Sequence, residues 1–260
     1  MPAAGIVLAG GCSSRMGQPK AWLDWHGAPL LRRLCGIVAR GARGPVVVVR
    51  AAGQELPPLP HGVRVADDAR EGRGPLQGIL AGLEAVDADV AFVASVDLPF
   101  LHPQFVAAVC AAAEGVDAAV PHVGGHAQPL AAAYRPALAP VAAELLEGGD
   151  AGAMTLIARV RARVVDQPPH PESVRNLNAR ADYEAALGEP EPLVRVRRIG
   201  PGVQTASVRA ATLGAAAAAV GVELGAHVLA ALNGDTAARD PLEPLAEDDD
   251  VAFVAADAAG

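Results

Sequence analysis

Short apolar runs alternate with longer helical patterns through most of this chain, and that alternation constrains the fold more than any other feature. The clearest run, Pro45–Arg50, holds four consecutive valines. A continuous β-branched run predicts a parallel strand buried on both faces, because a strand with one solvent face alternates apolar with polar residues. Strands separated by helices form βαβ units. We therefore expect an α/β fold with a doubly wound, Rossmann-like sheet.

The same patterns predict the other elements of this region. The expected strands are Gly5–Ala9, Val63–Ala66, Val90–Val96, Ala118–Val120 and Ala131–Tyr134, and the expected helices are Ala28–Arg40, Leu76–Val86 and Pro103–Ala113. Proline opens the last of these helices at its first position, where its missing N–H has no helical partner to lose.

The composition changes after Leu187. The stretch Gly188–Pro192 is polar and punctuated by prolines, which is typical of a linker. Beyond it, expected strands lie at Val194–Ile199, Thr205–Ala210, Val228–Leu232 and Val251–Ala255, with an alanine-rich helix after the second strand and a turn at Asn233-Gly234. We expect one domain at 1–187, a linker at 188–192 and a small α+β domain of β-grasp type at 193–260.

Charge and cysteine content exclude several classes of function. The formal net charge of −8 argues against binding to nucleic acid or to an anionic membrane, since both need a basic face. Cys12, Cys35 and Cys110 show no CxxC pairing, which indicates a reducing compartment and no structural zinc. The apolar start is too short for a signal peptide, and no Lys or Arg precedes it. We expect a cytoplasmic protein.

The most informative segment runs from Leu8 to Lys20, directly after the first expected strand. It reads Leu-Ala-Gly-Gly-Cys-Ser-Ser-Arg-Met-Gly-Gln-Pro-Lys. Paired glycines let backbone N–H groups approach a polyphosphate closely, and Arg15 and Lys20 add positive charge. The segment matches neither the P-loop nor the dinucleotide-binding GxGxxG pattern. It predicts a phosphate-binding loop of another kind.

This segment resembles the signature loop of molybdenum cofactor guanylyltransferases, whose pattern is LAGG-x-S-x-RMG-x-x-K, with every fixed position present. The resemblance covers about Gly5 to Leu187. It implies a nucleotidyltransferase that moves GMP from GTP to molybdopterin, with Arg15 and Lys20 acting on the phosphates. The residues that it places along the nucleotide are Leu8, Ala9, Gly10 and Gly11.

Acidic residues match two further elements of that family. Asp67-Asp68, ahead of Gly74–Gly78, matches a D…GPL-x-G stretch whose aspartate binds nucleotide. Asp68 is the better match to that aspartate, although the spacing also allows Asp67. The alternative is that the aspartate caps the following helix. Asp97 ends an apolar run, at the edge where open α/β sheets bind ligands, and a carboxylate there favours a hard cation. The resemblance makes Asp97 the ligand of Mg²⁺.

Two weaker matches concern the acceptor side. Asn176-Leu177-Asn178 resembles the family's N-x-N element and implies that Asn178 lies at the active site, whereas the residues alone indicate an Asx turn or helix cap. Gln128 precedes a proline where the family carries a polar residue near the pterin. The chain departs from the family at Val49-Arg50, where an asparagine can stand, so part of the base or ribose contact stays open.

The C-terminal region, Leu193–Gly260, resembles the small sulfur-carrier subunit of molybdopterin synthase, a ubiquitin-like β-grasp protein. The match lies in Ala231–Gly234 and in residues 241–253. Such a carrier needs a Gly-Gly tail, whereas this chain ends Ala259-Gly260. The domain is expected either to carry sulfur or to dock other molybdenum-cofactor assembly proteins.

Three rival functions can be weighed against these residues. A cytidylyltransferase acting on the same cofactor usually has alanine at the first glycine of the pair, so Gly10 favours guanylyl transfer. A sugar-phosphate nucleotidyltransferase shares the loop but does not explain the appended domain. A carrier or scaffold with an inert transferase half is disfavoured by Lys20 and Asp97, because an inert domain has no use for phosphate-site charges.

Overall fold

The structure is a computed structural model that describes residues 2–10, 17–68, 73–199, 203–225, 227–234 and 236–255. Its contacts divide the chain into two compact units. The first comprises Met1–Leu23 with Pro29–Arg180, and the second comprises Asp24–Ala28 with Ala181–Gly260. The domain boundaries given above stay a prediction. No helix within the described ranges is both long and apolar enough to span a membrane.

The first unit is built on one mixed sheet. Its strands lie in the order β10 (Ala162–Asp166), β7 (Ala118–Val123), β9 (Ala131–Tyr134), β6 (Ala91–Ser95), β1 (Ala4–Leu8), β4 (Val46–Ala51) and β5 (Arg64–Asp68), and β8 (His126–Ala127) pairs with β7. Strands β6, β1, β4 and β5 are parallel, which confirms the expected α/β class. Strand β9 runs antiparallel to β6 and β7, because the connection from Val123 to Ala131 is shorter than the dozen or so residues of a parallel crossover.

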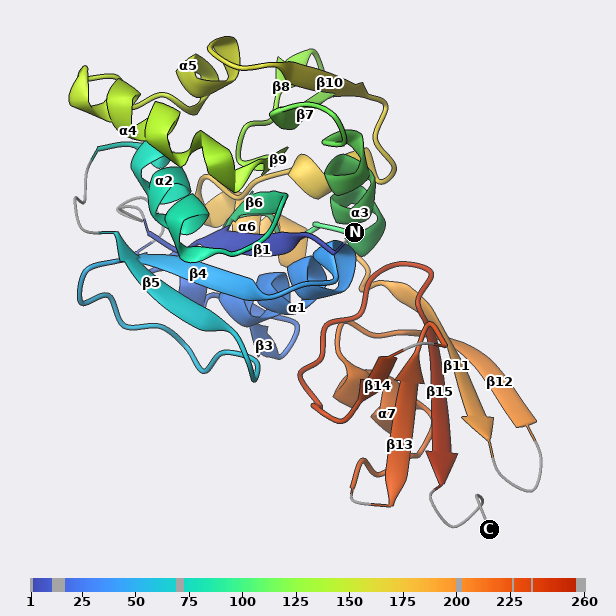
Figure 1. Ribbon diagram of the computed structural model, residues 1–260. Coiled ribbons are helices and arrows are strands. Elements are labelled where there is room, and N and C mark those ends of the chain that lie inside the picture. The colour runs from blue at the N-terminus through green and yellow to red at the C-terminus, as the bar shows by residue number, and fades with distance from the viewer. Residues whose placement is uncertain are drawn as a thin grey trace. The chain divides into compact units, whose positions relative to one another are not determined.

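Helices cover both faces of this sheet. Their bounds are α1 (Leu30–Ala42), α2 (Pro75–Ala85), α3 (Pro103–Ala112), α4 (Ala139–Glu147) and α5 (Ala153–Ala158), with 3-10 turns η1 (Lys20–Trp22), η2 (Pro136–Leu138) and η3 (Pro171–Val174). A Cβ built on Gly5 would lie 2.3 Å from Val38 of α1, and one on Gly82 of α2 would lie 2.4 Å from Ile6. Neighbouring residues of β1 face opposite sides, so α1 and α2 cover opposite faces (Figure 1).

The second unit contains a five-stranded sheet in the order β12 (Val203–Arg209), β11 (Leu193–Ile199), β15 (Asp250–Ala255), β13 (Val228–Leu232) and β14 (Thr236–Ala238). Only the β11–β15 pair is parallel. Helix α7 (Leu213–Ala219) starts at Thr212, whose Oγ1 accepts a hydrogen bond from Ala215 N, and it packs on one face over Val196 and Phe253.

The same unit includes α6 (Arg180–Leu187) from Ala181 onward and the strand β2 (Asp24–Trp25), which pairs with β3 (Ala28–Pro29). The Tyr183 hydroxyl donates to the carbonyl of Asp24 at 2.6 Å. This contact attaches a segment near the N-terminus to a helix far along the chain.

Candidate functional site

Polar groups gather where four parallel strands of the first unit end. Leu8 lies beside Val49 on one side and Ser95 on the other, and Ala51 lies beside Asp68. The carboxyl ends of β1, β4, β5 and β6 therefore form one edge. Open α/β sheets bind their ligands outside this edge.

Lys20 and Asp97 meet at that edge, although they are far apart in the sequence. Lys20 Nζ lies 2.8 Å from Asp97 Oδ2, and the two side chains are 18% and 16% exposed. Ser95 Oγ donates to the other oxygen, Asp97 Oδ1, at 2.5 Å. A partly buried carboxylate is stabilised by such donors, since an unpaired charge there is costly. Both predicted catalytic residues that the structure describes thus occupy one place, and Ser95 is a third member that sequence reasoning missed.

The third predicted catalytic residue, Arg15, lies outside the described residues, as does Gly11. Leu8, Ala9 and Gly10 leave β1 at the same edge, and Ala9 N donates to Val49 O at 2.8 Å. A Cβ on Gly10 would lie 3.5 Å from Ala51 N, an ordinary contact distance. Among the residues that the structure describes, none therefore lies too close to Gly10 for a methyl group.

Gln54 ties the ends of β1 and β4 together. Its side-chain amide donates to Ala9 O at 3.0 Å, and its Oε1 accepts from Ala51 N at 3.1 Å. These two bonds fix the carbonyl direction at Ala9, next to Gly10. The sequence contained no signal for this role, because Gln54 lies in an irregular stretch after β4 and its partners become neighbours only in the sheet.

Asp67 and Asp68, neighbours on β5, point to opposite faces, and a partner of Asp67 is clear. Arg50 Nε donates to Asp67 Oδ1 at 2.7 Å, and Arg50 Nη1 donates to Gln54 O at 3.0 Å. Arg50, which belongs to the Val49-Arg50 pair noted above, therefore links Asp67 to the Gln54 loop. The nucleotide role of Asp68 stays a prediction.

The segment that carries Asn178 is attached to the turn after Asp97. Leu177, which is buried, donates its N–H to Asp97 O at 3.0 Å, and Asn178 Nδ2 donates to Asn176 Oδ1 at 3.1 Å. Both asparagines are exposed. The Arg175 guanidinium lies 3.5 Å from the ring centroid of Phe100 and adds a cation–π contact to the attachment. Asn178 therefore follows directly on a residue bonded to Asp97, and its role at the active site stays a prediction.

Stacked imidazoles strengthen the same attachment. The rings of His102 and His170 lie 3.6 Å apart at 17°, and His102 N donates to the hydroxyl of Ser173 at 3.2 Å. His102 Nδ1 also accepts from Gln104 N at the start of α3, so this nitrogen carries no proton. The segment 170–177, whose regular structure is the 3-10 turn η3, is thus held to the turn after Asp97 by side chains as well as by the backbone bond of Leu177.

Gln128 lies in the turn before β9. Its N–H donates to Pro121 O at 2.9 Å, and nearby Leu130 O accepts from Ser95 N at 2.9 Å. The buried Tyr134 hydroxyl donates to Pro129 O at 2.7 Å, and burial raises the pKa of this phenol. The turn is therefore anchored beside the end of β6, on the side away from β1.

The described cysteines are not catalytic thiolates. Burial raises the pKa of Cys35 to about 12 and that of Cys110 to about 12. Both are thiols at neutral pH, and Cys12 lies outside the described residues. Within the described ranges, no group of three His, Cys, Asp or Glu residues could together hold a metal ion.

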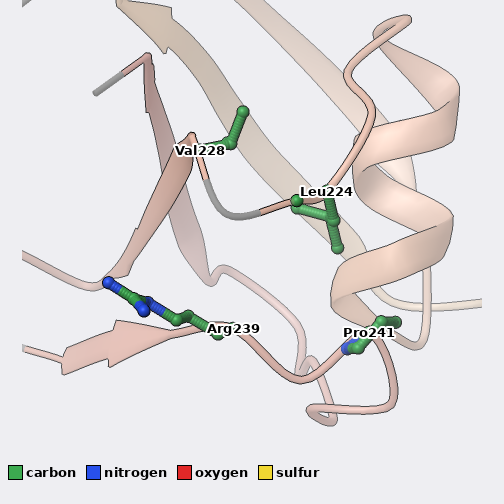
Figure 2. A pocket seen from close by; sticks show the side chains of 5 residues that line it. Leu224, Val228, Arg239 and Pro241 are labelled. Atoms are coloured by element: carbon green, nitrogen blue, oxygen red, sulfur yellow. The ribbon is translucent and has the colours of Figure 1, made fainter. Parts of the chain in front are cut away.

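A separate small pocket of about 170 Å³ lies in the second unit. Figure 2 shows Leu224, Val228, Arg239 and Pro241 around it. Among the described residues that line it, Arg239 is the charged one and the others are apolar or glycine.

Comparison with known proteins agrees with this geometry. A family described as MobA-like NTP transferase domain matches residues 5–164. A probable molybdenum cofactor guanylyltransferase of Pelotomaculum thermopropionicum is 33% identical over 211 residues, which are 80% of this chain and 98% of that protein. A protein of the same description from Natronomonas pharaonis is 33% identical over 74% of this chain and 96% of its own length.

Solved structures show the same fold at lower identity. Molybdopterin-guanine dinucleotide biosynthesis protein A from Archaeoglobus fulgidus has a TM-score of 0.57 at 21% identity, over 70% of this chain and 96% of its own. The 2-C-methyl-D-erythritol 4-phosphate cytidylyltransferase of Thermus thermophilus has a TM-score of 0.55 at 22% identity, over 72% of this chain and 98% of its own. From the matched residues and the length shared with these relatives, the chain belongs to the MobA-like NTP transferase family.

Proposed function

We propose that the chain transfers GMP from GTP to the phosphate of molybdopterin, releasing pyrophosphate. The observation that carries the proposal is the Lys20–Asp97 pair beside Leu8–Gly10 at the carboxyl edge of the sheet. It occurs in a chain that is 33% identical to a probable molybdenum cofactor guanylyltransferase over nearly that protein's whole length.

The acceptor needs no general base. A phosphate monoester has a second pKa of about 6, so the acceptor phosphate is largely dianionic near neutrality. One of its oxygens forms a bond to the α-phosphorus of GTP, and the bond from that phosphorus to the bridging oxygen breaks. The bridging oxygen takes the electron pair and leaves with pyrophosphate. The protein has to align these groups and neutralise charge.

Lys20 is suited to the neutralising role. Its ammonium ends a flexible four-carbon stem, so it can move from Asp97 to a nearby phosphate without a backbone change. We expect Arg15 to add a second charge from the same loop.

A magnesium ion fits the same place. Mg²⁺ prefers oxygen ligands and is commonly held by one or two carboxylates together with substrate phosphates and water. Asp97 would be its ligand from this chain, a single carboxylate at the strand edge. When bound, the ion would neutralise charge that develops on the phosphates.

The remaining predicted contacts divide between the two substrates. Leu8, Ala9, Gly10, Gly11 and Asp68 are assigned to the nucleotide, and Asn178 and Gln128 to the pterin side. The places of the described residues support this assignment: Leu8 ends β1, Ala9 and Gly10 follow it, and Asp68 ends β5 at the same edge of the sheet. Asn178 instead follows the 170–177 segment, and Gln128 lies in the turn before β9.

The test is pyrophosphate release with molybdopterin, Mg²⁺ and each of GTP, CTP, ATP and UTP. We expect turnover with GTP that Asp97→Asn abolishes. The matched control is Asp250→Asn, which neutralises an ion-paired carboxylate of the second unit and should leave turnover unchanged. Preference for CTP would make the chain a cytidylyltransferase, and no turnover with any nucleotide would overturn the enzyme assignment.

For the second unit we propose a ubiquitin-like β-grasp fold that docks other molybdenum-cofactor assembly proteins. Its strand order supports the β-grasp fold, because the first and last strands pair in parallel at the centre of the sheet and α7 lies between the second and third strands along the chain. The tail Ala259-Gly260 lies outside the described residues. Mass spectrometry of the intact chain distinguishes docking from sulfur carriage after incubation with ATP, an activating enzyme and a sulfur donor. Only carriage leaves a terminal thiocarboxylate.

We also propose a cytoplasmic location, which the proposed use of GTP supports.

A further inference from the structure

Asp97 has two contacts of different kinds. Ser95 Oγ donates to Oδ1 at 2.5 Å, and Lys20 Nζ donates to Oδ2 at 2.8 Å. The chain therefore holds both carboxylate oxygens. With the Asp97 side chain only 16% exposed, solvent replaces a lost contact poorly.

The contact from Ser95 is fixed by the sheet. Ser95 is the last residue of β6, lies beside Leu8 of β1, and donates its own N–H to Leu130 O at 2.9 Å. The next residue, Val96, donates to Leu8 O at 3.1 Å. With its backbone held on both sides, the serine hydroxyl has one side-chain torsion left, and binding of a ligand does not need to disturb it.

The contact from Lys20 is of the opposite kind. Lys20 lies outside the sheet in the single turn η1, and its side chain has four rotatable carbon–carbon bonds. A nucleotide phosphate competes with Asp97 for the Lys20 ammonium, because both the phosphate and the carboxylate offer anionic oxygens. Once the ammonium turns to a phosphate, Oδ2 has lost this donor while Oδ1 keeps the serine hydroxyl.

We propose that Ser95 is a positioning residue that keeps the Asp97 carboxylate oriented when Lys20 moves to the nucleotide. The inference rests on the proposed GMP transfer. Because Oδ1 stays bonded to Ser95, Oδ2 is the oxygen presented to a cation and to the phosphates. A single hydroxyl at the end of β6 thus decides which face of the carboxylate the substrate meets.

The test compares Ser95→Ala with Ser95→Thr, which restores the hydroxyl and suits a strand. We expect Ser95→Ala to lower kcat for GMP transfer by about tenfold or more, since a lost bond to a charged group and a small misalignment each cost that much. The KM for GTP should stay within about twofold, because the nucleotide loop is untouched. Ser95→Thr should recover most of kcat. Ser207→Ala, the same change on the exposed strand β12, is the matched control and should behave as wild type.

A second readout does not depend on turnover. Titration of Mn²⁺ in the presence of GTP, followed by electron paramagnetic resonance, should show affinity about tenfold weaker in Ser95→Ala and restored in Ser95→Thr. Wild-type kcat and Mn²⁺ affinity in Ser95→Ala would overturn the proposal. So would a lowered Tm with both variants equally impaired, since that result marks a structural role. A wild-type protein that transfers no GMP would overturn the proposed function instead, and the Mn²⁺ titration would still decide the role of Ser95.

Discussion

The two units bury their strands in different ways. In the first unit, β4 buries Val46, Val47, Val48 and Val49 in succession, because helices cover both faces of the sheet. In the second unit, β11 buries Val194 and Val196 but exposes Leu193 and Arg195, because α7 covers a single face.

This difference decides where each unit can offer chemistry. The central strands of the first sheet are covered on both faces and carry apolar side chains, so Ser95 and Asp97 lie where β6 ends. A sheet with one open face carries its charges along the strands. Arg197 Nη2 of β11 lies 2.6 Å from Asp250 Oδ1 of β15, and both side chains are partly exposed to solvent. The first arrangement gathers polar groups at one edge of the sheet, and the second spreads them along an open face.

The largest expected effect contrasts the two ion pairs. Lys20→Ala should reduce GMP transfer by about 10³-fold, because it removes the charge that we propose acts on the transferring phosphate. Arg197→Ala removes a cation of the second unit's ion pair and should leave the rate unchanged. Steady-state pyrophosphate release measures both. Full turnover in Lys20→Ala would contradict the expectation that only the ion pair of the first unit takes part in GMP transfer.

The next test removes one buried ring from each unit. Phe92, in β6, and Phe253, in β15, are both almost fully buried. Truncation to alanine should cost about 3–5 kcal/mol of unfolding free energy in either case. If the units unfold separately, calorimetry will show Phe92→Ala moving one transition and Phe253→Ala the other. A single transition moved equally by both changes would contradict their independence.

A smaller effect tests the burial pattern itself. Val48→Ser and Val49→Ser should each lower the unfolding free energy by about 2–3 kcal/mol, since both faces of β4 are covered. In β11, Val196→Ser should cost a similar amount, whereas Arg195→Ser should cost less than about 0.5 kcal/mol because that side chain is exposed and its ion pair is long. Urea titration measures all four, and equal costs at Val196 and Arg195 would contradict the one-sided burial of β11.

The last prediction concerns the buried thiol of Cys35, which should make the free energy of unfolding fall at alkaline pH and leave it unchanged at neutral pH. Cys35 has an ordinary pKa of 9.0, which burial raises to about 12 against a partial opposing effect of Arg32. The folded state therefore keeps the thiol protonated while the unfolded chain ionises above pH 9. The stabilisation is complete below that value and is lost as pH rises toward 12. At pH 10 the loss should be about 1 kcal/mol.

Two measurements check this prediction. Urea titrations at pH 8 and pH 10 should show a smaller pH dependence in Cys35→Ala than in the wild type. Iodoacetamide at pH 8.5, read by peptide mass spectrometry, should leave Cys35 and Cys110 unmodified until urea is added. Rapid alkylation of the native protein would show that these thiols are not enclosed.

Patterns that repeat along the chain predicted the strands well. The valines of β4, the apolar run of β6 and the alternating residues of β11 each indicated a strand within two residues of its observed bounds. Strand β10 left no such signal, because Val164 and its neighbours at the sheet edge are largely exposed. The antiparallel direction of β9 was equally hidden, since it depends on the length of a connection rather than on the residues of the strand.

Two residues of the candidate site could be singled out from the sequence alone. Asp97 at a strand end and Lys20 in a glycine-rich segment indicate phosphate chemistry from residue type and position alone. Ser95 and Gln54 did not stand out, because a serine in a strand and a glutamine in a loop are ordinary until their partners are known.

What the sequence by itself determined was most of the strands together with helices α1, α2, α3 and α7, and the chemical character of the segment Leu8–Lys20. Both depend on local properties: the period of apolar residues and the types of side chain in one segment. Only the tertiary structure decided that Lys20 and Ser95 share Asp97, that Gln54 holds Ala9, and that Leu177 attaches the Asn178 segment to Asp97. Those contacts join residues from separate strands and loops, and packing of the sheet is what brings them within hydrogen-bond distance.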